Sequence, residues 1–133
     1  MGMFSALDSS SSGTKVSRIW LDAISDNVAN VNTIRPSGEE PFRARLVVAA
    51  AYEDGDDRGA QVEGIVREGG EAAQAFDPTH PYADAKGYVT LPKVDLSEEM
   101  TNMLIAQRSY QANLSVMDRV RDAYKAALSI GVK

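Results

Sequence analysis

The stretch that decides the fold is DLSEEMTNMLIAQRSYQANLSVMDRVRDAYKAALSIG, residues 95–131 of a chain of 133 residues. It opens with Asp95 and Glu98 at the spacing of a helix capping box. No proline interrupts it, and apolar residues recur at helical spacing as far as Ile130. We therefore predict one helix of about 50 Å, which is longer than the diameter of a globule of this size.

The apolar pattern of this helix predicts two contact surfaces. One seam has the 3.5-residue period of a helix that pairs with another helix. A second stripe appears on another face from the middle of the helix onward. Because the chain supplies only one other long helix, we predict that the first seam pairs with that helix and the second contacts neighbouring molecules. The first seam comprises Met100, Met103, Tyr110, Leu114, Met117, Tyr124 and Leu128, interrupted by the polar Gln107 and Arg121. The second comprises Val116, Val120, Ala123, Ala127 and Ile130.

The other long helix is predicted near the N-terminus, from about residue 10 to about residue 31. Ser9 to Ser12 form a polar run of the kind that starts helices, and Pro36 and Gly38 follow the end. Its residues at spacings of three and four form an amphipathic face. We expect this face to carry the helix pairing, through Val16, Ile19, Trp20, Ala23, Ile24, Asn27, Val28 and Val31.

The segment between the helices, residues 34–94, is predicted to be rich in β-structure. Strand candidates are Phe42 to Val48, Gln61 to Val66 and Gly87 to Leu91, and the polar breaks at 54–59 and 68–71 suit exposed turns. The predicted fold is thus mainly α with a small β module. Residues 1–33 form a first helical arm, residues 34–94 the β-rich module, and residues 95–133 a second arm that pairs with the first as a coiled coil.

Composition and charge exclude several classes of function. The net charge of −5 and the scatter of the 14 basic residues argue against nucleic-acid binding, which requires a clustered excess of Lys and Arg. The absence of cysteine excludes disulfides and thiolate metal sites. The N-terminal residues lack the pattern of a cleavable signal peptide, and no window approaches the length and apolarity of a membrane span.

No catalytic, metal or cofactor site is predicted. His80 is the only histidine, and with Asp77 or Asp84 it is the one candidate for a metal ligand or for the general base of a hydrolase. An architectural loop is favoured, because prolines hold this segment extended and no activated nucleophile accompanies the histidine. The acidic turn around Asp54 is similar to a calcium loop, but Arg58 and Ile65 stand where oxygen ligands are required.

Residues 21–33, LDAISDNVANVNT, resemble the N-terminal signature shared by flagellar rod and hook proteins, in which an amphipathic helix ends in an Asn-rich stretch. Residues 35–43, 76–84 and 87–89 narrow the resemblance to the proximal-rod family FlgC. The closing helix is also similar to that family at residues 98–100 and 108–113. The motif positions in the loops are Asn30, Asn32, Thr33, Asp77, Pro78, His80, Pro81 and Asp84.

This resemblance implies a structural subunit of the proximal rod, with no enzymatic activity and no cofactor. Its terminal helices would pair and pack against neighbouring subunits, building a helical drive shaft that transmits torque from motor to hook. Implied partners are copies of itself, other rod proteins, the basal-body ring and the base of the export gate, with no nucleic acid and no membrane insertion. The implied location is the periplasm-spanning rod, reached through the flagellar type III apparatus without signal cleavage. Alternatives are a sibling rod protein at another axial level and a free-standing helical adaptor.

Overall fold

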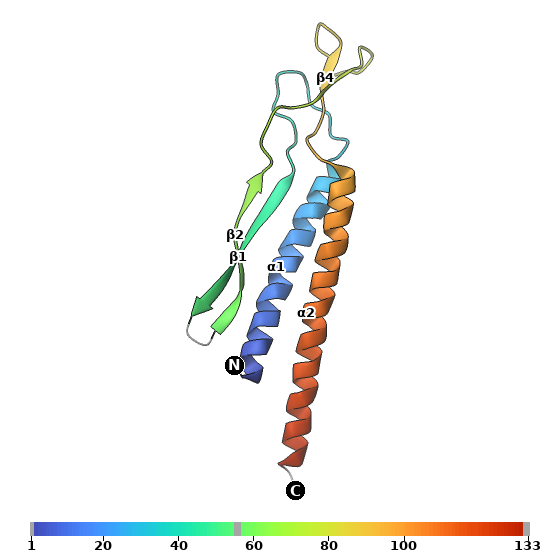
Figure 1. Ribbon diagram of the computed structural model, residues 1–133. Coiled ribbons are helices and arrows are strands. Elements are labelled where there is room, and N and C mark those ends of the chain that lie inside the picture. The colour runs from blue at the N-terminus through green and yellow to red at the C-terminus, as the bar shows by residue number, and fades with distance from the viewer. Residues whose placement is uncertain (1, 55–56, 132–133) are drawn as a thin grey trace.

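Two long helices lie side by side in the computed structural model, which describes residues 2–54 and 57–131 (Figure 1). Helix α1 spans Met3–Ala29 and helix α2 spans Leu96–Ile130. They run antiparallel, with the two chain ends at the same end of the pair, and α2 extends beyond the first turn of α1. With the strands that lie between the helices in sequence, this confirms the predicted class, mainly α with a small amount of β-structure.

Helix α1 begins at Met3, well before the predicted start near residue 10, so this boundary was wrong. The serine run does not cap the helix, because it lies inside it, and nearby hydroxyls donate to carbonyls of the same helix. Ser12 Oγ donates to the Ser9 carbonyl at 2.8 Å, and Thr14 Oγ1 donates to the Ser10 carbonyl at 2.8 Å. The helix ends close to the predicted position, where Asn30 forms the C-cap.

Helix α2 begins as its sequence predicted. The Asp95 carboxylate accepts hydrogen bonds from the backbone amides of Ser97 at 2.8 Å and Glu98 at 3.2 Å, which satisfies two amides that have no partner inside the helix. The reciprocal bond predicted from Glu98 to the Asp95 amide is not among those made within the described part of the chain. Glu98 and Glu99 still place negative charge at the positive end of the helix dipole.

The middle segment forms two separate antiparallel sheets. Strands β1 (Arg45–Asp54) and β2 (Asp57–Arg67) make a long hairpin with a bulge between Val48 and Ala49, and β3 (Gln74–Phe76) pairs with β4 (Tyr88–Thr90). The first strand starts at Arg45, later than the predicted Phe42. The strands extend into the predicted turn at 54–59, whose centre, residues 55–56, lies outside the described residues.

The long hairpin packs along α1, so that α1 lies between the hairpin and α2 (Figure 1). The backbone N–H of Ala60 donates to Ser12 Oγ at 3.1 Å, which ties the hairpin to the middle of the helix. Gly59 permits this approach, since a Cβ built there would lie 2.5 Å from Ser12 Oγ. The small β3–β4 sheet forms a tip at the end opposite the chain termini. The division into arm, module and arm stays a prediction.

The packed core is small and lies in the half of the helix pair near the tip. Its fully buried apolar residues are Ala23, Ile24, Ala44, Val89 and Ala106. Towards the termini, the buried residues of α1 are Ser10 and Ser17, and no residue after Ala106 in the described part of α2 is fully buried. Neither α1 nor α2, as described, is both long enough and apolar enough to cross a membrane. Because no described residue of α2 after Ala106 is fully buried, much of the apolar surface of α2 remains uncovered.

Candidate assembly interface

The contact between α1 and α2 is built on two interleaved rows of α2 residues, each with a spacing of one heptad. One row is Glu99, Ala106, Asn113 and Val120, and the other is Met103, Tyr110, Met117 and Tyr124. Four contacts place the rows against α1. Asn27 bonds Glu99 at 2.8 Å, Thr14 Oγ1 lies 3.9 Å from the Met117 sulfur, the Phe4 and Tyr124 rings are 6.4 Å apart, and a Cβ built on Gly13 would lie 2.8 Å from Asn113 Nδ2.

The predicted first seam coincides with the observed contact between α1 and α2 at only some of its positions. It shares Met103, Tyr110, Met117 and Tyr124 with the observed contact, but its other positions lie one residue too late along the helix. Met100 is 59% exposed, Leu114 38% and Leu128 53%, and Gln107 is also exposed. The helix is rotated relative to the prediction because the small Ala106 and the polar Glu99 and Asn113 face α1, and a search for apolar residues gives these positions little weight.

Val120 also differs from its prediction. It was assigned to the stripe that contacts other molecules, but it lies with Phe4, Leu7 and Tyr124 around a hollow of ≈ 330 Å³ between the two helices. Its side chain is only partly exposed. Val116 of the same predicted stripe is 40% exposed, but it lies with Ser9 and Ser10 of α1 and Arg58 of the hairpin around another hollow. The structure therefore places Val120 between the helices and leaves Leu114 38% exposed, the reverse of what the apolar pattern predicted.

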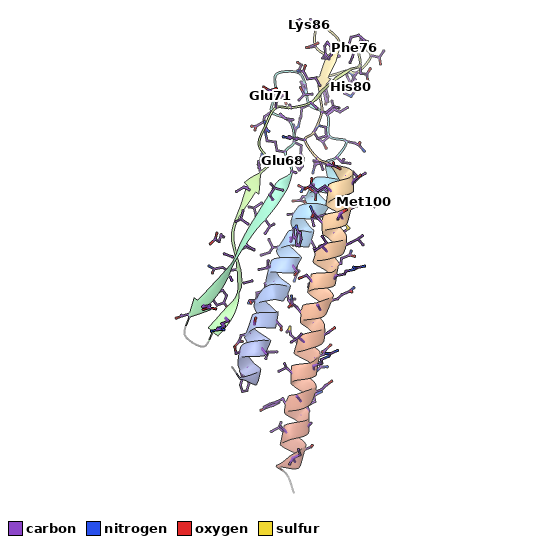
Figure 2. All side chains as sticks on the ribbon, in the orientation of Figure 1. Glu68, Glu71, Phe76, His80, Lys86 and Met100 are labelled. Atoms are coloured by element: carbon purple, nitrogen blue, oxygen red, sulfur yellow. The ribbon has the colours of Figure 1, made fainter. Side chains whose placement is uncertain are left out.

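The outer surface of α2 carries more apolar side chains than either predicted stripe. Leu104 is 60% exposed and Ile105 is 51% exposed, and sequence periodicity assigned neither of them. Met100 lies on the side of α2 away from α1 (Figure 2). Because Tyr124 already meets Phe4, the following turns, with exposed Ala127, Leu128 and Ile130, extend past the start of α1.

The predicted face of α1 serves two neighbours. Ala23, Ile24 and Asn27 are buried, while Val28 and Val31 are partly buried and Ile19 is 37% exposed. A groove of ≈ 380 Å³ separates α1 from the hairpin and reaches Ser109 of α2. It is lined from α1 by Gly13, Val16, Ser17 and Trp20, and from the hairpin by Val47, Ala49 and Ala60. Val16 and Trp20 thus face the hairpin side of the pair.

Asn27 joins three elements at one point. Its Nδ2 donates to the Arg45 carbonyl at 3.0 Å and to Glu99 Oε1 at 2.8 Å, and its Oδ1 accepts from the Arg45 amide at 2.7 Å. Asn27 is fully buried and Glu99 is 5% exposed. Desolvation raises the pKa of Glu99, and the neighbouring Glu98 and Glu68 act in the same direction, against the bond from Asn27. Sequence reasoning included Asn27 in the pairing face but missed Glu99.

The motif residues after α1 shape a tight turn. Asn30 Nδ2 donates to the Asp26 carbonyl at 2.8 Å, and Thr33 Oγ1 donates to Asn30 Oδ1 at 3.1 Å. The Thr33 amide donates to the Asn30 carbonyl at 3.0 Å, whereas Asn32 is exposed. These bonds end α1 and redirect the chain, so Asn30 and Thr33 have architectural roles here.

His80 and its neighbours stabilise loops at the tip, where His80, Phe76 and Lys86 lie far from the chain termini (Figure 2). His80 Nδ1 accepts from the Tyr82 amide at 3.1 Å, so this nitrogen is already engaged. Asp77 Oδ1 accepts from Thr79 Oγ1 at 2.7 Å, and this bond lowers the pKa of Asp77. Pro78 lies beside Gly87 and Pro81 is exposed.

Asp84 organises the turn before β4. Its Oδ1 accepts from the amides of Tyr88 at 2.9 Å and Lys86 at 2.8 Å, and its Oδ2 accepts from Ser37 Oγ at 3.2 Å. The bond from the Tyr88 amide is the main cause that lowers the pKa of Asp84. Among residues 2–54 and 57–131, no three His, Asp or Glu side chains gather as a metal site would require. The acidic side chains of the tip accept hydrogen bonds from backbone amides, and these bonds fix the conformation of its loops.

Comparison with known proteins matches this architecture to a class of axial structural proteins. The family described as flagellar basal body rod FlgEFG protein C-terminal matches residues 85–130, which include all of β4 and all of α2. The class that the paired helices and this match define is the flagellar rod protein.

Full-length relatives narrow the class to one family. The chain is 33% identical to the flagellar basal-body rod protein FlgC of Borreliella burgdorferi, with 98% of each chain covered. It is 32% identical to FlgC of Yersinia enterocolitica over 98% of this chain and 99% of that one, and 33% identical to FlgC of Aquifex aeolicus over 94% of each. The chain belongs to the FlgC family of flagellar basal-body rod proteins. This is a family of structural proteins, and the chain is not an enzyme.

Proposed function

We propose that this structural subunit of the flagellar basal-body rod polymerises through the outer surface of α2, and so helps to build the shaft that carries torque from motor to hook. The observation that supports this proposal is a set of apolar side chains on α2 that α1 leaves uncovered. With exposed fractions from 38% to 79%, they are Met100, Leu104, Ile105, Leu114, Leu128 and Ile130.

Burial of these side chains would supply the free energy of assembly. Apolar surface gains about 25 cal/mol per Å² when it leaves water, and single soluble molecules seldom expose large contiguous apolar patches. The subunit alone has a small core confined to the half near the tip. Neighbours that cover α2 would therefore stabilise the end of the pair that has least internal packing.

The turns of α2 beyond Tyr124 are the clearest contact with another subunit. They follow Tyr124, which already meets Phe4 in the first turns of α1, and they retain Ala127, Leu128 and Ile130 as exposed apolar positions. We assign these residues to contacts between subunits, together with the exposed residues Met100 and Leu114. The residues between α1 and α2, including Met103, Tyr110, Met117, Val120 and Tyr124, are assigned to helix pairing within the subunit.

The finer expectations on partners and route rest on the family resemblance. They are contacts with copies of this chain, other rod proteins, the basal-body ring and the base of the export gate, and passage through the flagellar type III apparatus without signal cleavage. A sibling rod protein at another level is disfavoured, because matches to FlgC cover 94% to 99% of both chains. A free-standing adaptor is disfavoured by the uncovered surface of α2.

A charge at the overhanging end of α2 tests this assignment. Ile130→Asp should leave the circular dichroism of the purified subunit unchanged, since Ile130 is 79% exposed and has no partner from α1. Cells that carry this variant should lose swimming and assembled rods, because an unpaired carboxylate would enter an apolar contact. Ser129→Asp is the matched control, with the same charge added at the neighbouring exposed residue, and it should swim. Normal motility of Ile130→Asp cells would refute the assignment of this end to subunit contacts.

A further inference from the structure

The Asn27–Glu99 pair is the least replaceable contact between the two helices. The Asn27 amide uses Nδ2 twice and Oδ1 once, and all three bonds reach other elements. Glu99 brings its other oxygen, Oε2, to the same place, where it is buried and has no hydrogen-bond partner. A buried polar group that loses its partner costs free energy, so the buried Asn27 amide favours the alignment that keeps the Glu99 acceptor opposite it.

The other contacts between α1 and α2 do little to fix the axial register of the two helices. Because the α2 rows repeat every heptad, a slip of one heptad exchanges Met103 for Tyr110, Tyr110 for Met117 and Asn113 for Val120 at each α1 position. Each incoming side chain already occupies such a site one heptad along α2. The exchanges of Met for Tyr and of Tyr for Met stay among large, mainly apolar side chains, which cores tolerate, whereas the exchange of Asn113 for Val120 replaces an amide by an apolar group.

The hydroxyl contact between α1 and α2 discriminates only weakly between the observed register and a slipped one. Ser17 Oγ donates to Ser109 Oγ at 3.1 Å, and Ser17 is 3% exposed. A serine in a helix can instead bond the carbonyl four residues before it, so a slip would not leave this donor unpaired. The Asn27 amide has no such alternative, because its two bonds to Arg45 already fix its orientation. After the slip, Ala106 would face Asn27 and offer no acceptor.

We infer that the Asn27–Glu99 pair selects the axial register of α1 against α2, and thereby fixes how far α2 projects beyond α1. This is a positioning role, analogous to a single buried asparagine that sets register in a coiled coil at some expense of stability. A slip of one heptad would move the projecting end by about 10 Å relative to the hairpin and the tip. This inference rests on the proposed function in one respect only, which is that the projecting end of α2 contacts neighbouring subunits.

The chain has no cysteine, so engineered pairs can report the register of the purified subunit. Ser17→Cys with Ser109→Cys reports the observed register, in which the two hydroxyl oxygens are 3.1 Å apart. Ser17→Cys with Val116→Cys reports a slip of one heptad in one direction, and Ser10→Cys with Ser109→Cys reports the opposite slip. In the otherwise unchanged protein, only the first pair should form a disulfide rapidly under mild oxidation.

Removal of the polar pair should relax this selection. With Asn27→Leu and Glu99→Leu together, at least one slipped reporter should form its disulfide roughly tenfold faster or more, because an unpaired buried group no longer penalises the slip. Glu99→Gln is the conservative control. It retains an acceptor for Asn27 and should keep the original pattern.

Moving the acidic partner provides a gain-of-register test. Glu99→Ala with Ala106→Glu places a carboxylate one heptad later, where Asn27 can reach it only after the slip. The preferred disulfide should then change from the Ser17–Ser109 pair to the Ser17–Val116 pair. This measurement needs no rod assembly, so its failure is distinguishable from failure of the Ile130→Asp experiment.

Two results would overturn the inference. One is retention of the Ser17–Ser109 pattern, with unchanged rates, in both the double leucine variant and the relocated variant. The other is loss of helical circular dichroism in both variants, because the pair would then stabilise the fold as such and not choose between registers.

Discussion

Replacement of Val120 by aspartate should loosen the end of the helix pair that carries the chain termini. Val120 lies with Phe4, Leu7 and Tyr124 around the hollow between α1 and α2. Full burial of a valine is worth about 1.5–3 kcal/mol, so a partly buried one contributes about 1 kcal/mol. Partial desolvation of the new carboxylate adds about 1 kcal/mol more. The pairing of the first turns of α1 with α2 should therefore weaken by about 2 kcal/mol.

Amide hydrogen exchange measures this local effect. A loss of about 2 kcal/mol raises the population of the open form by roughly 30-fold, so amides in the first turns of α1 should exchange faster by that factor. Leu114→Asp is the comparison, because Leu114 is 38% exposed on the flank of α2. It should change the same rates by no more than about threefold, as surface substitutions usually do.

The comparison also tests the rotation of α2 about its own axis. If Leu114→Asp accelerates exchange in α1 more than Val120→Asp does, the contact rows given above are wrong and the apolar seam predicted from sequence is the correct one. Motility should respond differently from exchange. Both variants should impair it, Leu114→Asp through subunit contacts and Val120→Asp through the internal pair.

Two further predictions concern single positions. Glu99→Gln should stabilise the subunit by about 1 kcal/mol at neutral pH, because a buried amide costs less than a buried carboxylate with one unpaired oxygen. The raised pKa of Glu99 means that the folded state holds this proton more tightly than the unfolded state, so wild-type stability falls as pH rises through the folded pKa. The advantage of the variant in urea unfolding should shrink as pH falls towards 4.5, the ordinary value for this group, and an advantage independent of pH would contradict this account. Gly87→Ala should destabilise the tip by about 2 kcal/mol, since φ is +83° and a Cβ would lie 2.8 Å from the Phe76 ring, and unchanged amide exchange at Val89 would contradict it.

Local signals in the sequence determined the elements of this protein. Asp95 bonds the first amides of α2 wherever that helix packs, and Asn30 with Thr33 ends α1 through bonds within a few residues. The apolar period likewise predicted that α2 pairs with the N-terminal helix. These features depend on neighbours in the chain, so the sequence alone is sufficient to predict them.

Tertiary packing decided which residues occupy each surface. Ala106, Ser17 and Gly13 face the partner because they permit close approach, and Glu99 faces it because Asn27 supplies a hydrogen bond. Hydropathy gives such residues little weight, so the apolar pattern placed Leu114 inside and Val120 outside. The position of the hairpin along α1 also depends on Ser12 meeting Ala60, 48 positions apart in the chain. The inner face of α2 is set by what fits against α1, and that depends on two helices at once.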